Sequence, residues 1–198
     1  MQNIITELVC TRLSHDIIGN IGAVANAVEL LEEGDVDFMD DIKSILKTSS
    51  TTLAARLKFF RMAFGLNNAN LEDEITVKNI AQDYLFTLGN KDFPINLQFD
   101  VPLARNRKNA LLMIMVIADI LIRGGNIKAY CNENSLIVDI DASLKISTDK
   151  LTKIKDALYA SSCNQDASLA PLACLLDQEN KLSLVVNDTH IKLVMENI

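Results

Sequence analysis

A histidine followed directly by an aspartate, His15-Asp16, is the part of this sequence whose residue types best suit chemistry. The chain has only two histidines, and the other, His190, lies in the last predicted β-hairpin. A neutral imidazole beside a carboxylate can attack phosphorus, because the carboxylate orients the ring or accepts the departing proton. A helical histidine is also commonly an ordinary surface residue, so the surrounding residues must decide between the two interpretations.

Small residues follow the histidine within two helical turns, namely Gly19 and Gly22, with Asn20 next to the first. Each glycine costs a helix about 1 kcal/mol relative to alanine, so a helix built only for stability would not contain them. The glycines allow either close packing of a second helix through small residues or a surface kept open for a partner.

The helix that must position His15 is predicted over residues 3–33, which contain no proline. Its apolar residues recur every three or four positions, a spacing typical of the seam of a coiled coil or helical bundle. His15 lies about 200° around the helix from Ile17, so its imidazole should face solvent rather than the seam. The seam comprises Leu13, Ile17, Ile21, Val24, Val28 and Leu31.

A second apolar stripe over residues 37–64 predicts another long helix after a tight turn at Gly34. The stripe runs through Ile42, Leu46, Ser49, Leu53, Leu57, Phe60 and Phe64. Two helices joined in this way form an antiparallel hairpin, which should dimerise or dock on another surface because it leaves apolar side chains wet.

Charged residues of the hairpin fall into two groups. Arg56 lies in the region opposite His15, and Arg12 lies one turn before it; each could offset the charge of a phosphohistidine or an acidic partner, or be a solvated side chain with no role. Acidic residues near the turn are interpreted as solvated capping charge rather than a metal site, because nothing fixes their geometry. They are Glu32, Glu33, Asp35, Asp37, Asp40 and Asp41.

The pattern of elements changes after the polar segment 66–70, which is interpreted as a hinge. We therefore divide the chain into a helical hairpin, residues 1–66, and a C-terminal domain, residues 71–198. That domain is predicted to be α+β, with helices on one face of a mixed or antiparallel sheet. Helices are expected over 75–88, 103–123, 149–160 and 167–179, and strands over 95–100, 126–131, 136–140, 182–186 and 190–195.

Composition and charge exclude several classes of protein. The formal net charge of −7 argues against a role in neutralising nucleic-acid backbones. The N-terminus lacks the features of a signal peptide, and the longest apolar run, 110–122, is interrupted by Asp119 and is shorter than the roughly 20 residues that span a bilayer. We therefore expect a soluble, cytoplasmic protein. The four cysteines are far apart and form no CxxC motif, so they are expected to be reduced structural thiols.

The string Leu13-Ser14-His15-Asp16-Ile17-Ile18-Gly19-Asn20-Ile21-Gly22-Ala23 resembles the H-box of the ChpT-type histidine phosphotransferases of alphaproteobacteria, relatives of the phosphotransfer hairpin of histidine kinases. The segment 56–65 ends the second helix as in that family, and Arg123-Gly124-Gly125 follows the buried helix where the family has a similar turn. One departure is Gly19-Asn20, where the family often has Ser-Pro. The missing proline bears on local helix geometry and on partner choice.

The resemblance implies a homodimer in which two hairpins form a four-helix bundle, followed by a degenerate, histidine-kinase-ATPase-like α/β domain. Met113 and Ile117 occupy the places of asparagines that hold magnesium and phosphates in an active kinase. Residues 139–144 lack the expected glycine box, and Gly125 is the last glycine in the chain. Since a backbone that approaches phosphates needs glycine, we expect no bound ATP and no metal or cofactor of the chain's own.

The predicted function is therefore a phosphorelay histidine phosphotransferase without ATP-dependent kinase activity. His15 and Asp16 are the predicted catalytic residues, and the residues predicted to contact the partner or the phosphate are Arg12, Gly19, Asn20, Gly22 and Arg56. The resemblance implies a hybrid kinase receiver domain as donor and cell-cycle response regulators as acceptors, with Mg²⁺ supplied by the receiver. The alternative is a non-catalytic dimeric adaptor or inhibitor that binds a receiver or kinase domain through the same hairpin.

Overall fold

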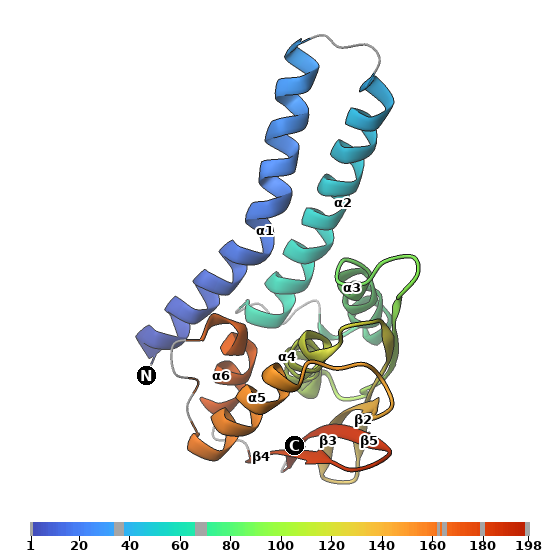
Figure 1. The fold of residues 1–198 in the computed structure, drawn as a ribbon. Helices are drawn as coiled ribbons and strands as arrows, with labels where there is room; N and C mark the ends of the chain where they lie inside the picture. Colours follow the sequence, from blue (N-terminus) through green and yellow to red (C-terminus); the bar gives the residue numbers. More distant parts are fainter. Residues whose placement is uncertain are drawn as a thin grey trace.

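The fold, taken from a computed structural model, joins a helical N-terminus to an α/β part built on a five-stranded mixed sheet (Figure 1). The structure describes residues 2–33, 38–65, 71–161, 163, 166–178 and 181–196. The predicted turn at Gly34, the acidic residues Asp35 and Asp37, and the predicted hinge at 66–70 lie outside the described residues.

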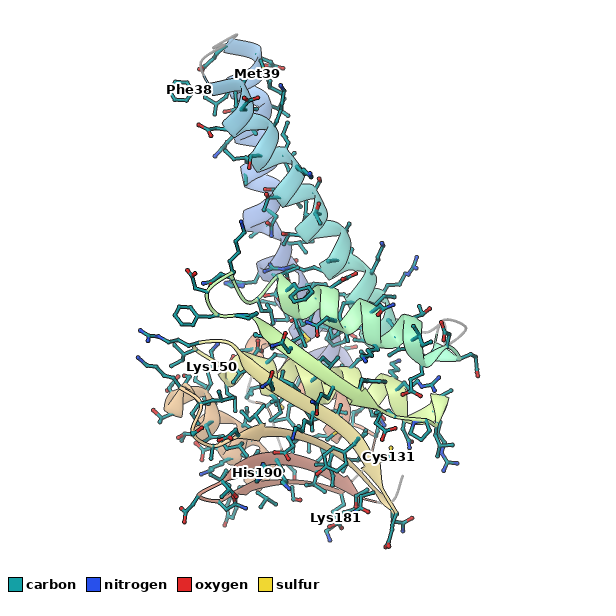
Figure 2. The ribbon with its side chains drawn as sticks, turned by 90° about the vertical axis from the view of Figure 1, so that its right-hand side faces the viewer. Phe38, Met39, Cys131, Lys150, Lys181 and His190 are labelled. Atoms are coloured by element: carbon teal, nitrogen blue, oxygen red, sulfur yellow. The ribbon has the colours of Figure 1, made fainter. Side chains whose placement is uncertain are left out.

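Two long helices, α1 (Gln2–Glu33) and α2 (Met39–Phe64), form the predicted hairpin. Ala27 and Ile42 are buried between them, and the far end of the hairpin, marked by Phe38, lies away from the sheet (Figure 2). Four residues of the predicted seams are exposed within one copy of the chain: Ile21, Val28 and Leu31 on α1, at 36% to 47%, and Leu57 on α2, at 53%. Leu57 is exposed because the end of α2 nearest the sheet turns Phe59 into the core instead.

The sheet has the strand order β1-β2-β3-β5-β4. Its strands are β1 (Ile95–Asp100), β2 (Gly125–Asn132), β3 (Ser135–Asp141), β4 (Lys181–Val186) and β5 (His190–Glu196). β1 and β2 are parallel and every other pair is antiparallel, so the chain must cross over between β1 and β2, which it does through a buried helix. The predicted strands are confirmed to within a residue at each end.

Helices cover one face of this sheet and separate it from the foot of the hairpin (Figure 1). They are α3 (Glu74–Phe86), α4 (Ala104–Ile120), α5 (Thr148–Ala160), the short 3-10 helix η3 (Ala167–Leu169) and α6 (Ala170–Leu176). The crossover helix α4 contacts both the sheet and α2, while α6 contacts α1 and β4. Helix α4 ends earlier than predicted, because Leu121 leaves the helix to form a β-bridge with Ile146.

A single hydrophobic core joins the foot of the hairpin to the α/β part. The ring of Phe59 on α2 stacks on that of Tyr84 on α3 with centroids 3.9 Å apart, and Phe60 meets the same tyrosine edge-on at 5.7 Å. Aromatic side chains contribute large buried areas and restricted packing geometries, so this contact fixes the hairpin to the layer beneath it. The division of the chain near residue 70 stays a prediction.

Arg107 on α4 links the segment that precedes α3 to the segment that follows β1. Its side chain is 5% exposed and donates hydrogen bonds to backbone carbonyl oxygens and to the carboxylate of Glu74. The carbonyl groups belong to Leu71, Glu72, Val101 and Pro102. A buried guanidinium is tolerated because its donors are satisfied in this way.

Candidate functional site

His15 lies on the open side of α1, and its side chain is 86% exposed. Leu13 and Ile17 pack against the core from the same helix, which turns the imidazole outward as the periodicity predicted. The imidazole borders a hollow of about 470 Å³ that is lined by Cys10, Thr11, Ser14, His15 and Ile18. The ring is thus open to solvent rather than enclosed.

Asp16 is held between the imidazole and a buried arginine. Its Oδ1 lies 3.5 Å from Nδ1 of His15, and its Oδ2 accepts a hydrogen bond of 2.7 Å from Nε of Arg12. The Asp16 side chain is 15% exposed, so the carboxylate has a defined position. A carboxylate on this side of the ring favours the tautomer with hydrogen on Nδ1, which leaves the lone pair of Nε2 free to attack.

Arg12 is not the exposed cation that the sequence suggested. It is 7% exposed and donates two parallel hydrogen bonds to Asp119 of α4, from Nη1 to Oδ2 at 2.6 Å and from Nη2 to Oδ1 at 2.9 Å. Nη1 also donates to the carbonyl oxygen of Ser168 at 3.3 Å. Burial opposes the charge, but the hydrogen bond and the charge of Asp119 outweigh it and raise the pKa of Arg12. The guanidinium is therefore permanently charged, and its donors are bound to buried groups of the same chain rather than exposed to a partner.

Arg56 lies opposite the histidine on α2, where the hairpin geometry predicted it. Its Nη1 donates to the backbone carbonyl oxygen of Asp16. Its Nε donates to Oγ1 of Thr87 at 3.1 Å, and its Nη2 donates to the carbonyl oxygen of the same residue at 3.3 Å. Arg56 thus links α1, α2 and the end of α3 while remaining partly exposed.

Gly19 and Gly22 are exposed, as is the neighbouring Ile18 at 63%. A Cβ built on either glycine would meet nothing within 4 Å in the described part of the chain. The interpretation that these glycines allow close helix packing therefore has no support within one copy of the molecule. The surface one and two turns beyond His15 is open, while Asn20 is partly buried beside it.

Asp119 and Tyr84 belong to the site but were missed as site residues. Asp119 is the lone charge in the apolar run 110–122, and that pattern was the available signal. Tyr84 is fully buried, and within the described ranges its hydroxyl is the buried side-chain polar atom without a hydrogen-bond partner. Burial raises the pKa of Tyr84, and the negative charge of Asp119 raises it further.

His190 forms a different pair, on the sheet (Figure 2). Its Nδ1 lies 2.9 Å from Oδ1 of Asp139, and Nζ of Lys192 lies 3.7 Å from the other oxygen of that carboxylate. The His190 side chain is 40% exposed, less than half the value for His15. This histidine lies on a strand within a hydrogen-bonded sheet and does not adjoin an open helix face.

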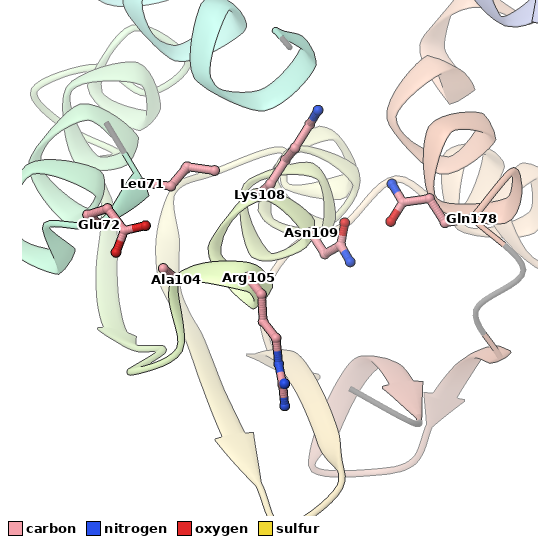
Figure 3. A pocket seen from close by; sticks show the side chains of 7 residues that line it. All are labelled: Leu71, Glu72, Ala104, Arg105, Lys108, Asn109 and Gln178. Atoms are coloured by element: carbon pink, nitrogen blue, oxygen red, sulfur yellow. The ribbon is translucent and has the colours of Figure 1, made fainter. Parts of the chain in front are cut away.

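A second hollow, of about 440 Å³, lies at the N-terminal end of α4 (Figure 3). It is lined by Leu71, Glu72, Ala104, Arg105, Lys108, Asn109 and Gln178. Lys108 is already engaged there, since its Nζ donates to the carbonyl oxygen of Gly65 at 2.9 Å. Farther along the same helix, Met113 and Ile117 are completely buried in the core.

The four cysteines are unpaired, as predicted. Burial raises the pKa of Cys163 and of Cys174 to about 11, so both thiols stay protonated near neutral pH. Over the residues that the structure describes, no three His, Cys, Asp or Glu side chains are grouped to hold a metal ion. Nor does any helix in that part of the chain have the length and hydropathy to cross a membrane.

The whole fold matches that of a solved bacterial phosphotransferase, with a TM-score of 0.73 over 97% of this chain and 95% of that one, at 22% identity. In sequence, the chain is similar to the protein phosphotransferase ChpT of Brucella abortus (strain 2308), with 37% identity over 123 residues. That match covers 61% of this chain and 57% of the relative's length. No family model matches. The resemblance stated from the H-box is thereby confirmed.

Replacing Gly19 and Gly22 with alanine should stabilise the protein by about 1 kcal/mol at each position, because both glycines lie inside a helix with open space around them. Chemical denaturation measures the change. The matched control is Ala25→Gly at another exposed position of α1, which should lose a similar amount. A loss of stability in the alanine variants would show instead that the glycines are packed against a second molecule.

Proposed function

We propose that this chain is a histidine phosphotransferase that relays a phosphoryl group between receiver-domain aspartates of a two-component phosphorelay, with His15 as the acceptor. The observation that carries the proposal is the exposed imidazole of His15 with the carboxylate of Asp16 held on its Nδ1 side. The similarity to a protein phosphotransferase supports it.

In the proposed reaction, Nε2 of His15 attacks the phosphorus of an aspartyl phosphate on the donor. A P–N bond forms as the P–O bond to the aspartyl carboxylate breaks, and that carboxylate leaves with the bonding electrons. The ring becomes positively charged while it keeps the hydrogen on Nδ1, and the carboxylate of Asp16 stabilises that charge. The reverse steps pass the phosphoryl group to the next aspartate.

Little further machinery is required of this chain, because positioning and charge neutralisation account for most of phosphoryl-transfer catalysis. We expect Mg²⁺ to be held by the receiver domain. Arg56 is the cation placed to offset the phosphoryl charge, since it reaches the residue next to His15 and stays partly exposed. Gly19, Asn20 and Gly22 would form the surface on which the receiver docks.

We further propose that two copies pair through their hairpins to form a four-helix bundle. Exposed apolar side chains gather on the upper half of the hairpin, and contiguous exposed apolar surface favours association. They include Ile21, Val28, Leu30, Leu31, Phe38 and Ile45, each between 36% and 55% exposed. A second copy, whose hairpin carries the same exposed side chains, would bury many of them in a four-helix bundle.

The α/β part would be a degenerate relative of a histidine-kinase ATPase domain that does not bind ATP. Support comes from Met113 and Ile117, whose side chains fill the core at the places where an active kinase has asparagines. By resemblance, the donor would be a hybrid kinase receiver domain and the acceptors response regulators of the cell cycle, all in the cytoplasm.

His15→Ala should abolish phosphoryl acceptance while the fold persists, because the variant removes an exposed nucleophile and no packed group. The measurement is acid-labile, alkali-stable label on the chain after incubation with a phosphorylated receiver domain. His190→Ala is the matched control and should label normally. Receiver binding without any label on the native chain would contradict the proposal and favour the adaptor function.

Val28→Glu should shift the protein from dimer to monomer, because it places a charge in the proposed bundle. Sedimentation equilibrium measures the oligomeric state. Val186→Glu on β4 is a matched control, because that valine is 42% exposed against 43% for Val28. An unchanged dimer in the Val28 variant, or a wild-type monomer, would exclude the bundle.

ATP with Mg²⁺ should show no saturable heat of binding in a calorimetric titration at millimolar nucleotide. An active histidine kinase domain, titrated alongside, is the positive control. Binding with a micromolar Kd would contradict the degenerate assignment and bring ATP-dependent kinase activity back into consideration.

A further inference from the structure

Three charged side chains beneath His15 form one buried cluster drawn from two distant parts of the chain. Arg12 lies between the carboxylates of Asp16 and Asp119, with N–O distances of 2.7 Å to the first and 2.6 and 2.9 Å to the second. The three side chains are 9%, 15% and 15% exposed. One cation between two anions gives these three side chains a formal charge of −1.

The position of Asp119 is unfavourable for α4 on its own. It lies in the last turn of that helix, where the helix dipole favours cations over carboxylates. It also interrupts an apolar run in which the flanking residues are buried. The bidentate bond to Arg12 compensates, and Nζ of Lys150 donates to the backbone carbonyl oxygen of the same residue at 2.8 Å. A helix optimised only for packing would have an apolar residue here.

We propose that Asp119 is a positioning residue for the phosphoryl acceptor. By binding both terminal nitrogens of Arg12, it directs Nε of that arginine at Asp16, which fixes the Asp16 carboxylate on the Nδ1 side of His15. By neutralising Arg12, it also leaves the negative charge of Asp16 available to the ring. The α/β part thus sets the tautomer and orientation of the imidazole through a chain of three side chains.

This inference rests on the proposed role of His15, but its effect on the ring can be measured without any phosphoryl transfer. The ¹⁵N chemical shifts of the two ring nitrogens report the fraction of the tautomer with hydrogen on Nδ1. Asp119→Asn should reduce that fraction, because an uncompensated Arg12 draws the Asp16 carboxylate away from the ring. The matched control is Asp139→Asn, which removes another nearly buried, paired carboxylate and should leave His15 unchanged.

The second readout is the rate at which His15 is phosphorylated by phosphoramidate, a small donor that needs no docking surface. Asp119→Asn should slow this reaction by about tenfold or more relative to the wild type, since misplacing a reacting group by about 1 Å has effects of that size or larger. Asp139→Asn should react at the wild-type rate.

If Asp119→Asn does not fold, the double variant Arg12→Met/Asp119→Leu removes both charges with side chains of similar volume, an exchange that buried ion pairs often tolerate. It should fold and show the same loss of the Nδ1–H tautomer and of rate, because Asp16 then has no anchor. A wild-type tautomer fraction in a folded Asp119 variant would overturn the inference. A wild-type protein that phosphoramidate cannot label would overturn the proposed function alone, since the tautomer result still stands.

Discussion

The buried guanidinium of Arg12 is the interaction on which the arrangement of the molecule depends. A charge in a site only 7% exposed is stable only when its donors are satisfied, and here they bind two carboxylates and a carbonyl oxygen from three separate elements. The geometry of the guanidinium is planar and rigid, so it constrains the approach of α1 to α4 and η3 more closely than apolar packing does. The helix that presents His15 is therefore oriented by the part of the chain that follows the hairpin.

The two ends of the hairpin have different physical character. At its foot, Arg56 donates to the backbone carbonyl oxygens of Asp16 and Thr87, and Phe59 stacks on Tyr84, so polar and apolar contacts both bind the helices to the layer below. Toward the far end, apolar side chains such as Val28 and Ile45 remain exposed. The foot is thus packed within one copy of the chain, whereas apolar side chains of the upper half remain exposed to solvent.

Local sequence patterns predicted most of the fold because helix and strand periodicities are local properties. The hairpin, all five strands and the outward direction of His15 followed from spacing alone. Pairing between distant residues did not, since periodicity carries no information about it. The sequence therefore suggests a solvated or partner-binding cation at Arg12 and only an interruption of an apolar run at Asp119. The exposure of Leu57 could not be predicted for the same reason. It follows from the contact of Phe59 with Tyr84, which is a tertiary contact between α2 and α3.

Arg56 gives the backbone carbonyl of Asp16 a side-chain donor in addition to the helical one. In an α-helix the carbonyl of residue 16 accepts from the N–H of residue 20, and a proline at position 20 would remove that donor. In this chain Arg56 donates to the same carbonyl from α2, so the carbonyl has a partner whichever residue occupies position 20. With Asn20 the helix continues without interruption to Glu33. The helix therefore runs unbroken past His15, and Arg56 fixes the backbone of Asp16 from the neighbouring helix.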